Sequence, residues 1–339
     1  EITTRLVGSE MCIRDRGMNM RFLKNFELDV TYYNAKTMNQ TFNPELPVGE
    51  YARIYIQTGA VRNQGLELAL NYNNTWKDFT WNTGVTYSMN KNKILTLADN
   101  AINPITHEKF SISSLNMGGL GSTRFILKEG GSMGDIYSLM DLKRDANGAV
   151  YIDENNSVVT ESLEANNYIK LGSVLPKGNL AWRNNFSWKN INVAFLVSAR
   201  LGGVVFSRTQ AVLDNFGVSE ASAAARDKGY VSVNGNDRVN PEGWYSVVAG
   251  GTAVPQYYIY SATNIRLQEA SIGYTIPRKW LGNVCDIKVS LIGRNLWMIY
   301  NKAPFDPESV ASTDNFYQGI DYFMMPSLRN IGFNLSFKF

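Results

Sequence analysis

The sequence has 339 residues, of which 44% are apolar, 12% aromatic and 19% charged, and its formal net charge is only +3. A largely disordered protein is excluded, because disordered chains are less apolar and usually carry a larger net charge. No run of five like charges marks a surface for nucleic acid, so no nucleic-acid partner is expected. Two cysteines, Cys12 and Cys285, and the single His107 supply too few ligands for a zinc site and too few thiols for a disulfide framework.

The remaining composition favours β-structure. The sequence contains 36 asparagines, 28 glycines and 18 tyrosines, which are common in turns and on pleated surfaces. No stretch reaches the roughly 18 apolar residues of a membrane-spanning helix. A membrane β-barrel is still compatible with the sequence, because each strand needs only about ten residues and turns only alternate side chains to the lipid.

Residues 1–16, which read EITTRLVGSEMCIRDR, differ from the rest of the chain. They have scattered charges and no apolar period, and they lack the apolar run and cleavage site of a secretory signal. The segment resembles a translated sequencing adapter, and the alternative is a genuine loop. We therefore expect residues 1–16 to be a non-native tail, with the protein itself extending upstream of Gly17.

From residue 22 onward, segments of about ten residues alternate between apolar and polar side chains, which is the period of a β-strand with two different faces. In the first segment, Phe26 and Leu28 alternate with Glu27 and Asp29. The predicted strands cover residues 26–32, 66–72, 79–87, 180–188, 191–201, 265–276, 287–297 and 331–339. The alternation changes phase near Glu269, which predicts a β-bulge.

The predicted connections have two lengths. Residues 73–78, the turn at Asn190 and residues 277–285 are short, whereas residues 95–121, 203–258 and 299–326 are long. Outer-membrane barrels combine short periplasmic turns with long extracellular loops. Four aromatic residues near strand ends suit interfacial girdles: Trp76, Trp188, Tyr274 and Trp297. The alternative is a soluble β-sandwich, but its strands are usually five or six residues long, so the lengths favour a barrel.

Several motifs occur in a recognisable order. Residues 61–68 read VRNQGLEL, residues 171–203 contain LG, a proline, a hairpin and GG, and residues 331–339 form an alternating terminal strand. The chain thereby resembles the C-terminal portion of SusC/RagA-type TonB-dependent outer-membrane transporters of Bacteroidota. The motif residues are Asn63, Gly65, Glu67, Arg266, Leu267, Gly273, Tyr274, Pro277, Asn295, Asp306, Pro307 and Glu308. The terminal strand looks like the family's assembly signal through Phe333, Leu335, Phe337 and Phe339.

This resemblance implies an all-β architecture, an antiparallel transmembrane β-barrel of about 22 strands in the complete protein. Residues 17–339 would form its C-terminal part, a partial barrel of roughly ten to twelve strands without the plug domain or the TonB box. The implied location is the outer membrane of a Gram-negative bacterium. The implied partners are a SusD-like lipoprotein, TonB, outer-membrane lipid, and an oligosaccharide or peptide ligand.

Aromatic and amide-rich loops are the predicted ligand surface, because aromatic faces stack on sugars and amphipathic aromatics suit binding surfaces. The candidate residues are Trp244, Tyr245, Tyr257, Tyr258, Phe305, Asp306, Phe316 and Tyr317. The alternative is that these side chains only fix the loops to one another. Polar strand residues are expected to line the lumen or contact the plug: Asn192, Arg200, Asn334 and Lys338.

Other motifs are weaker. The acidic stretch from Asp145 to Gly148 does not match the spacing of a calcium loop, and a hairpin with Asn147 and Gly148 in a type I′ turn is preferred. Asp306 and Glu308 lack the desolvated pocket that a glycosidase acid needs. We therefore expect a transport protein without enzymatic activity, cofactor or metal. The alternatives are a passive porin or structural barrel, and a secreted β-sandwich that binds carbohydrate.

Overall fold

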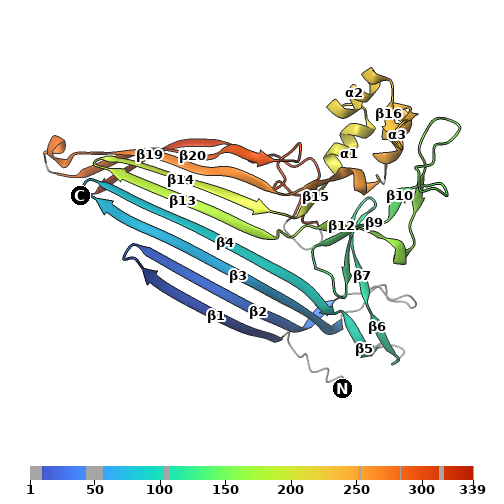
Figure 1. Cartoon of the computed structure of the whole chain (residues 1–339), viewed down its shortest axis with the longest axis horizontal. Helices are drawn as coiled ribbons and strands as arrows, with labels where there is room; N and C mark the ends of the chain where they lie inside the picture. Colours follow the sequence, from blue (N-terminus) through green and yellow to red (C-terminus); the bar gives the residue numbers. More distant parts are fainter. Residues whose placement is uncertain are drawn as a thin grey trace.

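The computed structural model describes residues 10–42, 56–102, 107–251, 253–282, 284–312 and 317–338. Its main feature is a nine-stranded antiparallel sheet in the order β1-β2-β3-β4-β13-β14-β19-β20-β22 (Figure 1). These strands are β1 (Glu10–Phe22), β2 (Phe26–Phe42), β3 (Ile56–Trp76), β4 (Phe79–Thr96), β13 (Gly178–Trp188), β14 (Ile191–Leu201), β19 (Asn264–Ile276), β20 (Asp286–Asn301) and β22 (Asn330–Lys338). The sheet is open, with β1 and β22 at its edges.

The predicted strands and hairpins are confirmed, and among the described residues the main sheet has nine long strands, where about ten to twelve were expected. The difference lies between β4 and β13, where the chain leaves the main sheet. There it forms β5 (Ala98–Ile102), β6 (Lys109–Ile112), β7 (Ser114–Leu120), β8 (Thr123–Lys128), β9 (Asp135–Ser138), β10 (Met140–Leu142), β11 (Thr160–Ser162), η1 (Ala165–Asn167) and β12 (Ile169–Ser173). These short strands build separate small sheets.

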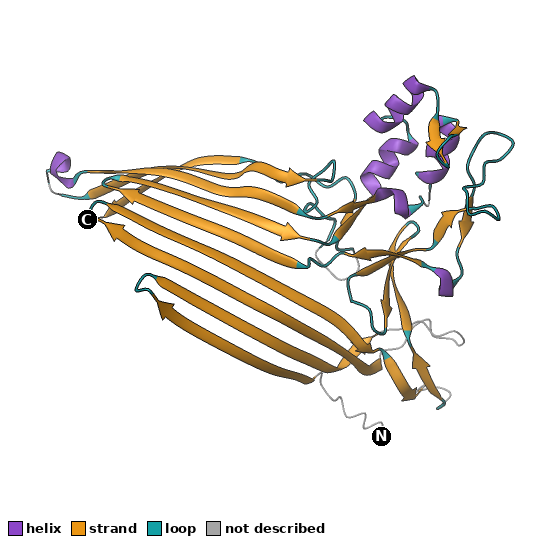
Figure 2. Ribbon diagram, in the orientation of Figure 1, coloured by secondary structure: helices purple, strands orange, loops and turns teal. Residues whose placement is uncertain are grey.

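The connection between β14 and β19 contains helices as well as short strands (Figure 2). Its elements are β15 (Val204–Ser207), α1 (Arg208–Asn215), α2 (Glu220–Lys228), β16 (Val231–Val233), β17 (Asp237–Val239), α3 (Pro241–Val248), η2 (Pro255–Tyr258) and β18 (Ile259–Ser261). Within its described residues, the last long connection contains one named element, β21 (Ile320–Asp321), which pairs with β15. The helices were not expected from the sequence.

All short turns lie at one end of the sheet and the long connections lie at the other (Figure 1). We call these the turn end, which also holds η3 (Arg278–Leu281), and the loop end. The expected alternation of short and long connections is therefore confirmed. Two long connections exceed their predicted bounds, since they run over residues 97–177 and 202–263.

No helix among the described residues has both the length and the apolar character needed to cross a membrane.

The main sheet is a single layer, and its apolar face is exposed. Leu291 and Phe333, for example, are 54% and 77% exposed. In the described part of the chain no second sheet covers this face, so the β-sandwich alternative is wrong. The buried cores lie at the loop end instead, one around Phe125, Ile136 and Phe206 and the other around Val61, Ile94 and Leu127.

The predicted bulge near Glu269 is confirmed. The pairing of β19 with β14 shifts between Leu196 and Val197, so that Gln268 has no partner in the ladder. The pairing of β19 with β20 shifts at the same place, opposite Asn295, whose φ is +51°. Asparagine tolerates this left-handed conformation better than most residues, which accounts for its place in the β20 bulge.

The expected type I′ turn at Asn147 and Gly148 is wrong in its detail. A hairpin is present, with Arg144 bridging Val150, but only Gly148 of the two turn residues has a positive φ, of +82°. The backbone N–H of Gly148 bonds to Asp145, and the Asp145 carboxylate accepts two further backbone N–H groups. The turn is a type I turn followed by a left-handed glycine, which requires one positive φ where type I′ requires two.

Residues 10–16 of the expected non-native tail lie in β1, where Glu10 pairs with Met38 and Arg16 with Tyr32. Their side chains are all exposed. Residues 1–9 lie outside the described residues. The non-native origin of residues 1–16 stays a prediction.

Candidate functional site

The two faces of the main sheet differ in polarity, and the same difference holds across its strands. On one face, directly paired residues form a polar row across seven strands: Thr31, Glu67, Ser88, Asn179, Arg200, Asn264 and Asn301. A row of directly paired residues on the other face, three or four positions away along the strands, is apolar: Leu28, Leu70, Val85, Trp182, Val197, Leu267 and Trp297. The predicted lumen residues Asn192, Arg200, Asn334 and Lys338 all lie on the polar face.

One polar residue of β4 and one of β13 interrupt the apolar face, and each of them accepts a hydrogen bond from an indole. Trp81 donates its Nε1–H to Asn184 Oδ1 at 3.2 Å, and Trp182 donates its Nε1–H to Thr83 Oγ1 at 3.1 Å. An indole N–H without a partner is costly in an apolar medium. These two hydrogen bonds therefore give the indole N–H groups of Trp81 and Trp182 a partner within the apolar face.

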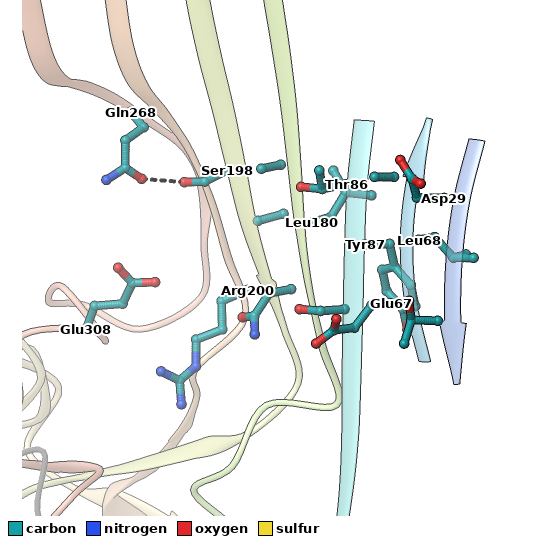
Figure 3. A pocket seen from close by; sticks show the side chains of 16 residues that line it. Asp29, Glu67, Leu68, Thr86, Tyr87, Leu180, Ser198, Arg200, Gln268 and Glu308 are labelled. Atoms are coloured by element: carbon teal, nitrogen blue, oxygen red, sulfur yellow. Dashed lines mark hydrogen bonds between the residues drawn. The ribbon is translucent and has the colours of Figure 1, made fainter. Parts of the chain in front are cut away.

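A pocket of about 500 Å³ lies on the polar face near the loop end, and we call it the wall pocket (Figure 3). Side chains from β2, β3, β4, β13, β14 and β19 line it together with the last long connection. Ser198 donates a hydrogen bond to Gln268 Oε1 at 2.7 Å, which uses the bulged residue of β19. Arg200 lies between Glu67 and Glu308 in Figure 3, and it donates to the Val174 carbonyl at 2.7 Å.

The charges of the wall pocket are mixed. Asp29, Glu67 and Glu308 supply carboxylates, and Arg200 supplies a guanidinium. Amide, hydroxyl and charged groups together suit a ligand with many hydrogen-bonding groups, or the polar surface of another protein segment. The arrangement therefore provides a hydrated, hydrogen-bonding wall.

An ion-pair cluster fixes the last long connection to the polar face of the main sheet. The Arg266 cluster consists of Asn264, Arg266, Asp306 and Glu308. The Arg266 guanidinium reaches Asp306 at 3.0 Å and Glu308 at 3.1 Å, and its Nε–H donates to Asn264 at 3.2 Å. The Arg266 side chain is 6% exposed and that of Asp306 is 9% exposed, so this ion pair is largely removed from solvent.

Hydrogen bonds explain the charge state of Asp306. Burial alone would raise its pKa, but hydrogen bonds from Ser327 and from the backbone N–H of Glu308, together with Arg266, outweigh burial and hold the pKa of Asp306 below its ordinary value of 3.8. The carboxylate is therefore ionised when the loop is attached.

The attachment is predicted to fail only in strong acid. Because the pKa of Asp306 is lower in the folded state, its ionised form adds stability above the ordinary pKa, and that stability is lost as the pH falls through the lowered value. Limited proteolysis with one protease active in acid and a second active at neutral pH should cleave residues 302–329 of the wild type only below pH about 4. Asp306→Asn should be cleaved at neutral pH as well. Equal cleavage of both proteins at neutral pH would contradict this prediction.

The loop aromatics expected to bind ligand are divided between two places. Trp244 in α3 packs edge-on against Tyr257 with ring centroids 5.2 Å apart, and Tyr245 lies nearby in the same helix. Tyr258 is only 2% exposed and donates its hydroxyl to Asp214 at 3.0 Å. This burial removes Tyr258 from the accessible ligand candidates and makes it a core residue of the loop end.

The remaining candidates lie in the last long connection. Phe305 packs edge-on against Tyr260, with ring centroids 5.5 Å apart, and Asp306 belongs to the Arg266 cluster. Tyr317 is exposed, and Phe316 lies outside the described residues. A role of these residues in ligand binding stays a prediction.

The buried Tyr258 hydroxyl gives a test of the loop-end core. Burial and the Asp214 carboxylate raise the pKa of Tyr258 well above its ordinary value, so the hydroxyl stays a proton donor. Tyr258→Phe leaves Asp214 short of one donor and should cost about 1–3 kcal/mol in the unfolding of this region. Hydrogen exchange of α1 and α3 would measure the loss. The half-exposed Tyr257→Phe is the matched control and should change exchange little.

The motif residues of β3 have identifiable contacts. Asn63 Oδ1 accepts hydrogen bonds from Asn90 at 3.2 Å and from Asn92 at 2.9 Å. Any side chain at Gly65 would meet the Tyr33 ring at 2.3 Å, so only glycine fits beneath it. Glu67 extends into the wall pocket. This motif therefore serves cross-strand packing and the polar wall together.

The motif residues of β19 and β20 act near the turn end and at the bulge. Gly273 leaves room for Ser290, and Tyr274 is exposed on the apolar face. Pro277 ends β19 and precedes η3. Leu267 is part of the apolar row, and Asn295 donates from Nδ2 to the Leu328 carbonyl at 3.2 Å. Pro307 is buried between the two acidic residues of the Arg266 cluster.

The terminal strand β22 pairs with β20 along its full length. Phe333, Leu335 and Phe337 project from its apolar face and are exposed, whereas Phe339 lies outside the described residues. Their role as an assembly signal stays a prediction.

Sequence reasoning missed three polar residues that organise the loop end: Asp214, Asn264 and Ser327. Asp214 accepts hydrogen bonds from Tyr258 and Gln210, while Asn264 and Ser327 complete the surroundings of the Arg266 cluster. The Asn264 position directly before the Arg266 motif was the only available signal. The other contacts join residues that are far apart in the sequence.

Comparisons with known proteins bear on the identity of this sheet. No model of a protein family matches the chain. TonB-dependent receptor P3 of Formosa agariphila is 26% identical and aligns with 96% of the chain and 34% of its own length. TonB-dependent receptor P26 of the same organism is 27% identical over 92% of the chain and 32% of its own length. The chain is therefore similar to TonB-dependent receptors over nearly all of its own length. It spans about a third of the length of these curated relatives.

Solved structures agree on the fold of this chain. The RagAB peptide importer in its closed-closed state superposes with a TM-score of 0.70 at 16% identity, covering 97% of the chain and 35% of the solved chain. Its open-open state also gives 0.70 at 16% identity, covering 97% and 34%. The expected SusC/RagA-type partial barrel is confirmed at the level of the fold. In a barrel of this fold, the apolar face of the main sheet corresponds to the outside of the wall and the polar face to the inside.

Proposed function

We propose that the receptor chain forms part of the wall of an outer-membrane importer that is driven through TonB. The opposition of the exposed apolar face and the polar face across nine strands carries this proposal. In lipid, a closed barrel satisfies all backbone groups and turns only its apolar side chains outward. The names of the relatives, which are TonB-dependent receptors, support energy coupling through TonB.

The ligand that we propose is an oligosaccharide, with a peptide as the alternative, captured together with a SusD-like lipoprotein at the loop end. The exposed aromatic residues at the loop end suit sugar rings, and the mixed wall pocket suits hydroxyl-rich or amide-rich ligands. The peptide alternative is supported by the name of the RagAB importer, which has the same fold. Transport needs no chemical change of the ligand, so the proposed protein is not an enzyme.

Uptake by cells tests the proposal. Cells that express the intact receptor would be given labelled oligosaccharides and peptides of similar size, with functional TonB and without it. We expect uptake of one ligand class to require both the receptor and TonB. Uptake that persists without TonB would instead support the passive porin.

The loop aromatic Trp244 provides the residue-level test. Trp244→Ala should weaken ligand binding to the intact receptor by roughly five- to tenfold, because a central aromatic contact is lost. Calorimetry against the same glycan and peptide panel would measure the change. Trp244→Phe keeps a ring against Tyr257 and should bind more tightly than the alanine variant. The exposed Phe216→Ala is a second control, and a loss there equal to that of Trp244→Ala would contradict the prediction.

A further inference from the structure

Two neighbouring turns at the turn end have the same local sequence. Trp76-Lys77-Asp78 connects β3 to β4, and Trp188-Lys189-Asn190 connects β13 to β14. Because β4 pairs with β13 as far as Phe79 and Trp188, the two turns lie side by side. The backbone N–H of Lys189 donates to the carbonyl of Asp78 at 3.0 Å, which joins one turn to the other.

Both turns place lysine where the backbone favours glycine. The φ of Lys77 is +51° and that of Lys189 is +50°, and Lys24 in the turn between β1 and β2 has a φ of +61°. Tight hairpins normally use Gly, Asn or Asp at such positions, because a long side chain is strained there. Glycine at these positions would relieve the backbone strain. The presence of lysine instead indicates that the lysine side chain has a role of its own.

The lysine side chains are exposed, and their charges are not neutralised locally. Lys24, Lys77 and Lys189 form no ion pair with any residue that the structure describes. Arg278 and Lys279 of η3 add positive charge at the same end (Figure 1). The described acidic residues near this end are Asp78, within the first turn, and Glu27 and Asp286, whose register positions lie on the polar face. Glu27 is paired with Arg21 at 3.0 Å.

The lysines lie next to exposed indoles. Trp76 and Trp188 are 47% and 53% exposed, and both stand on the apolar face. The Lys189 ammonium is 5.3 Å from the centre of the Trp188 ring. Apolar surface, indole and ammonium therefore follow one another along the strand direction. Lipid presents the same order of groups, from acyl chain through the interface to the headgroup.

We propose that Lys24, Trp76, Lys77, Trp188 and Lys189 form a binding surface for the headgroups of anionic phospholipids. The indoles occupy the interface, and the ammonium groups contact lipid phosphates. The charge complementarity and the unbroken continuation into the apolar face select a lipid over a soluble protein partner. This proposal rests on the proposed function, because it requires the receptor to be in a membrane.

Native mass spectrometry of the intact receptor tests the lipid surface. The detergent-solubilised receptor would be titrated with phosphatidylglycerol and, separately, with phosphatidylethanolamine. We expect a preference for phosphatidylglycerol that falls roughly fivefold for each lysine removed, and so about 25-fold in the double variant Lys77→Gly and Lys189→Gly. The double variant Lys77→Arg and Lys189→Arg keeps the charges and should retain the preference.

The thermal stability of the glycine variant and the membrane insertion of the wild-type receptor distinguish the possible outcomes of this experiment. The glycine variant removes the backbone strain of the two turns, so its thermal stability should be unchanged or higher. Its lipid binding should fall. A loss of lipid binding without a loss of thermal stability shows that the site is lost and the fold is kept. Unchanged phosphatidylglycerol binding in the glycine variant would overturn the lipid surface and leave the importer proposal standing. Displacement of phosphatidylglycerol by inorganic phosphate at equal concentration would also overturn it. A wild-type receptor that fails to enter the membrane would overturn both proposals.

Discussion

Leu291→Arg is expected to prevent efficient insertion of the barrel. Leu291 lies in β20 near the middle of the alternating stretch, where it pairs with Ile272 and Phe333 on the apolar face and is 54% exposed. An arginine facing the lipid near the midplane of the membrane costs about 2–4 kcal/mol in a transmembrane β-barrel. The effect would be measured as the folded fraction of intact receptor in lipid vesicles, by heat-modifiable migration on a gel.

The neighbouring Ser290→Arg is the matched control. Ser290 is one residue away but lies on the polar face, between Gly273 and Asn334. On the polar face an arginine side chain can extend into the water of the lumen, so the folded fraction should stay close to that of the wild type. An equal loss in both variants would mean that the two faces of β20 meet the same surroundings, which would contradict the barrel wall.

The opposition of these two faces was predictable because strand geometry has a strict period of two. The alternation of Phe26 and Leu28 with Glu27 and Asp29 is enough to assign the faces of β2, and pairing then extends them across the sheet. The bulge near Glu269 was predictable for the same reason, since one extra residue reverses the phase. The period-two alternation of the side chains was therefore sufficient to predict which face of the sheet is apolar and which is polar.

The loop end was less predictable, because its structure depends on packing between distant segments. Local signals for the helices were present, such as Ser219 before the alanine-rich α2 and Asn240-Pro241 at the start of α3. Their burial depends on contacts such as Tyr258 with Asp214, which no local pattern reveals. The small strands β5 to β12 are too short to show a clear period, so their place outside the main sheet could not be inferred.

In the candidate site, too, some features were predictable from the alternation of side chains and others depend on tertiary packing. The position of Arg200 on the polar face followed from alternation, but its place beside Glu308 depends on the path of the last long connection. The aromatic content of the loops predicted a ligand surface, with fixing of the loops to one another as the alternative. It did not distinguish Trp244, which packs against Tyr257, from Tyr258, which lies in the core. Composition identifies suitable side chains, and only the tertiary structure determines which of them are accessible.

Arg266→Leu is expected to release the last long connection from the wall. The substitution removes the positive charge that faces Asp306 at 3.0 Å and Glu308 at 3.1 Å, and it leaves the Asp306 carboxylate buried without its cation. Removing one partner of a buried ion pair typically costs about 3–5 kcal/mol. We expect residues 302–329 of the intact receptor to become sensitive to limited proteolysis at neutral pH while the barrel stays folded.

Arg294→Leu is a matched control for this prediction, because it breaks an ion pair of similar length in a different setting. Arg294 in β20 contacts Glu269 at 3.1 Å, but the two side chains are 67% and 43% exposed. Exposed pairs contribute about 0–1 kcal/mol, so this variant should resist proteolysis as the wild type does. Equal sensitivity of the two variants would show that charge on the polar face, rather than the buried Arg266 cluster, keeps the connection in place.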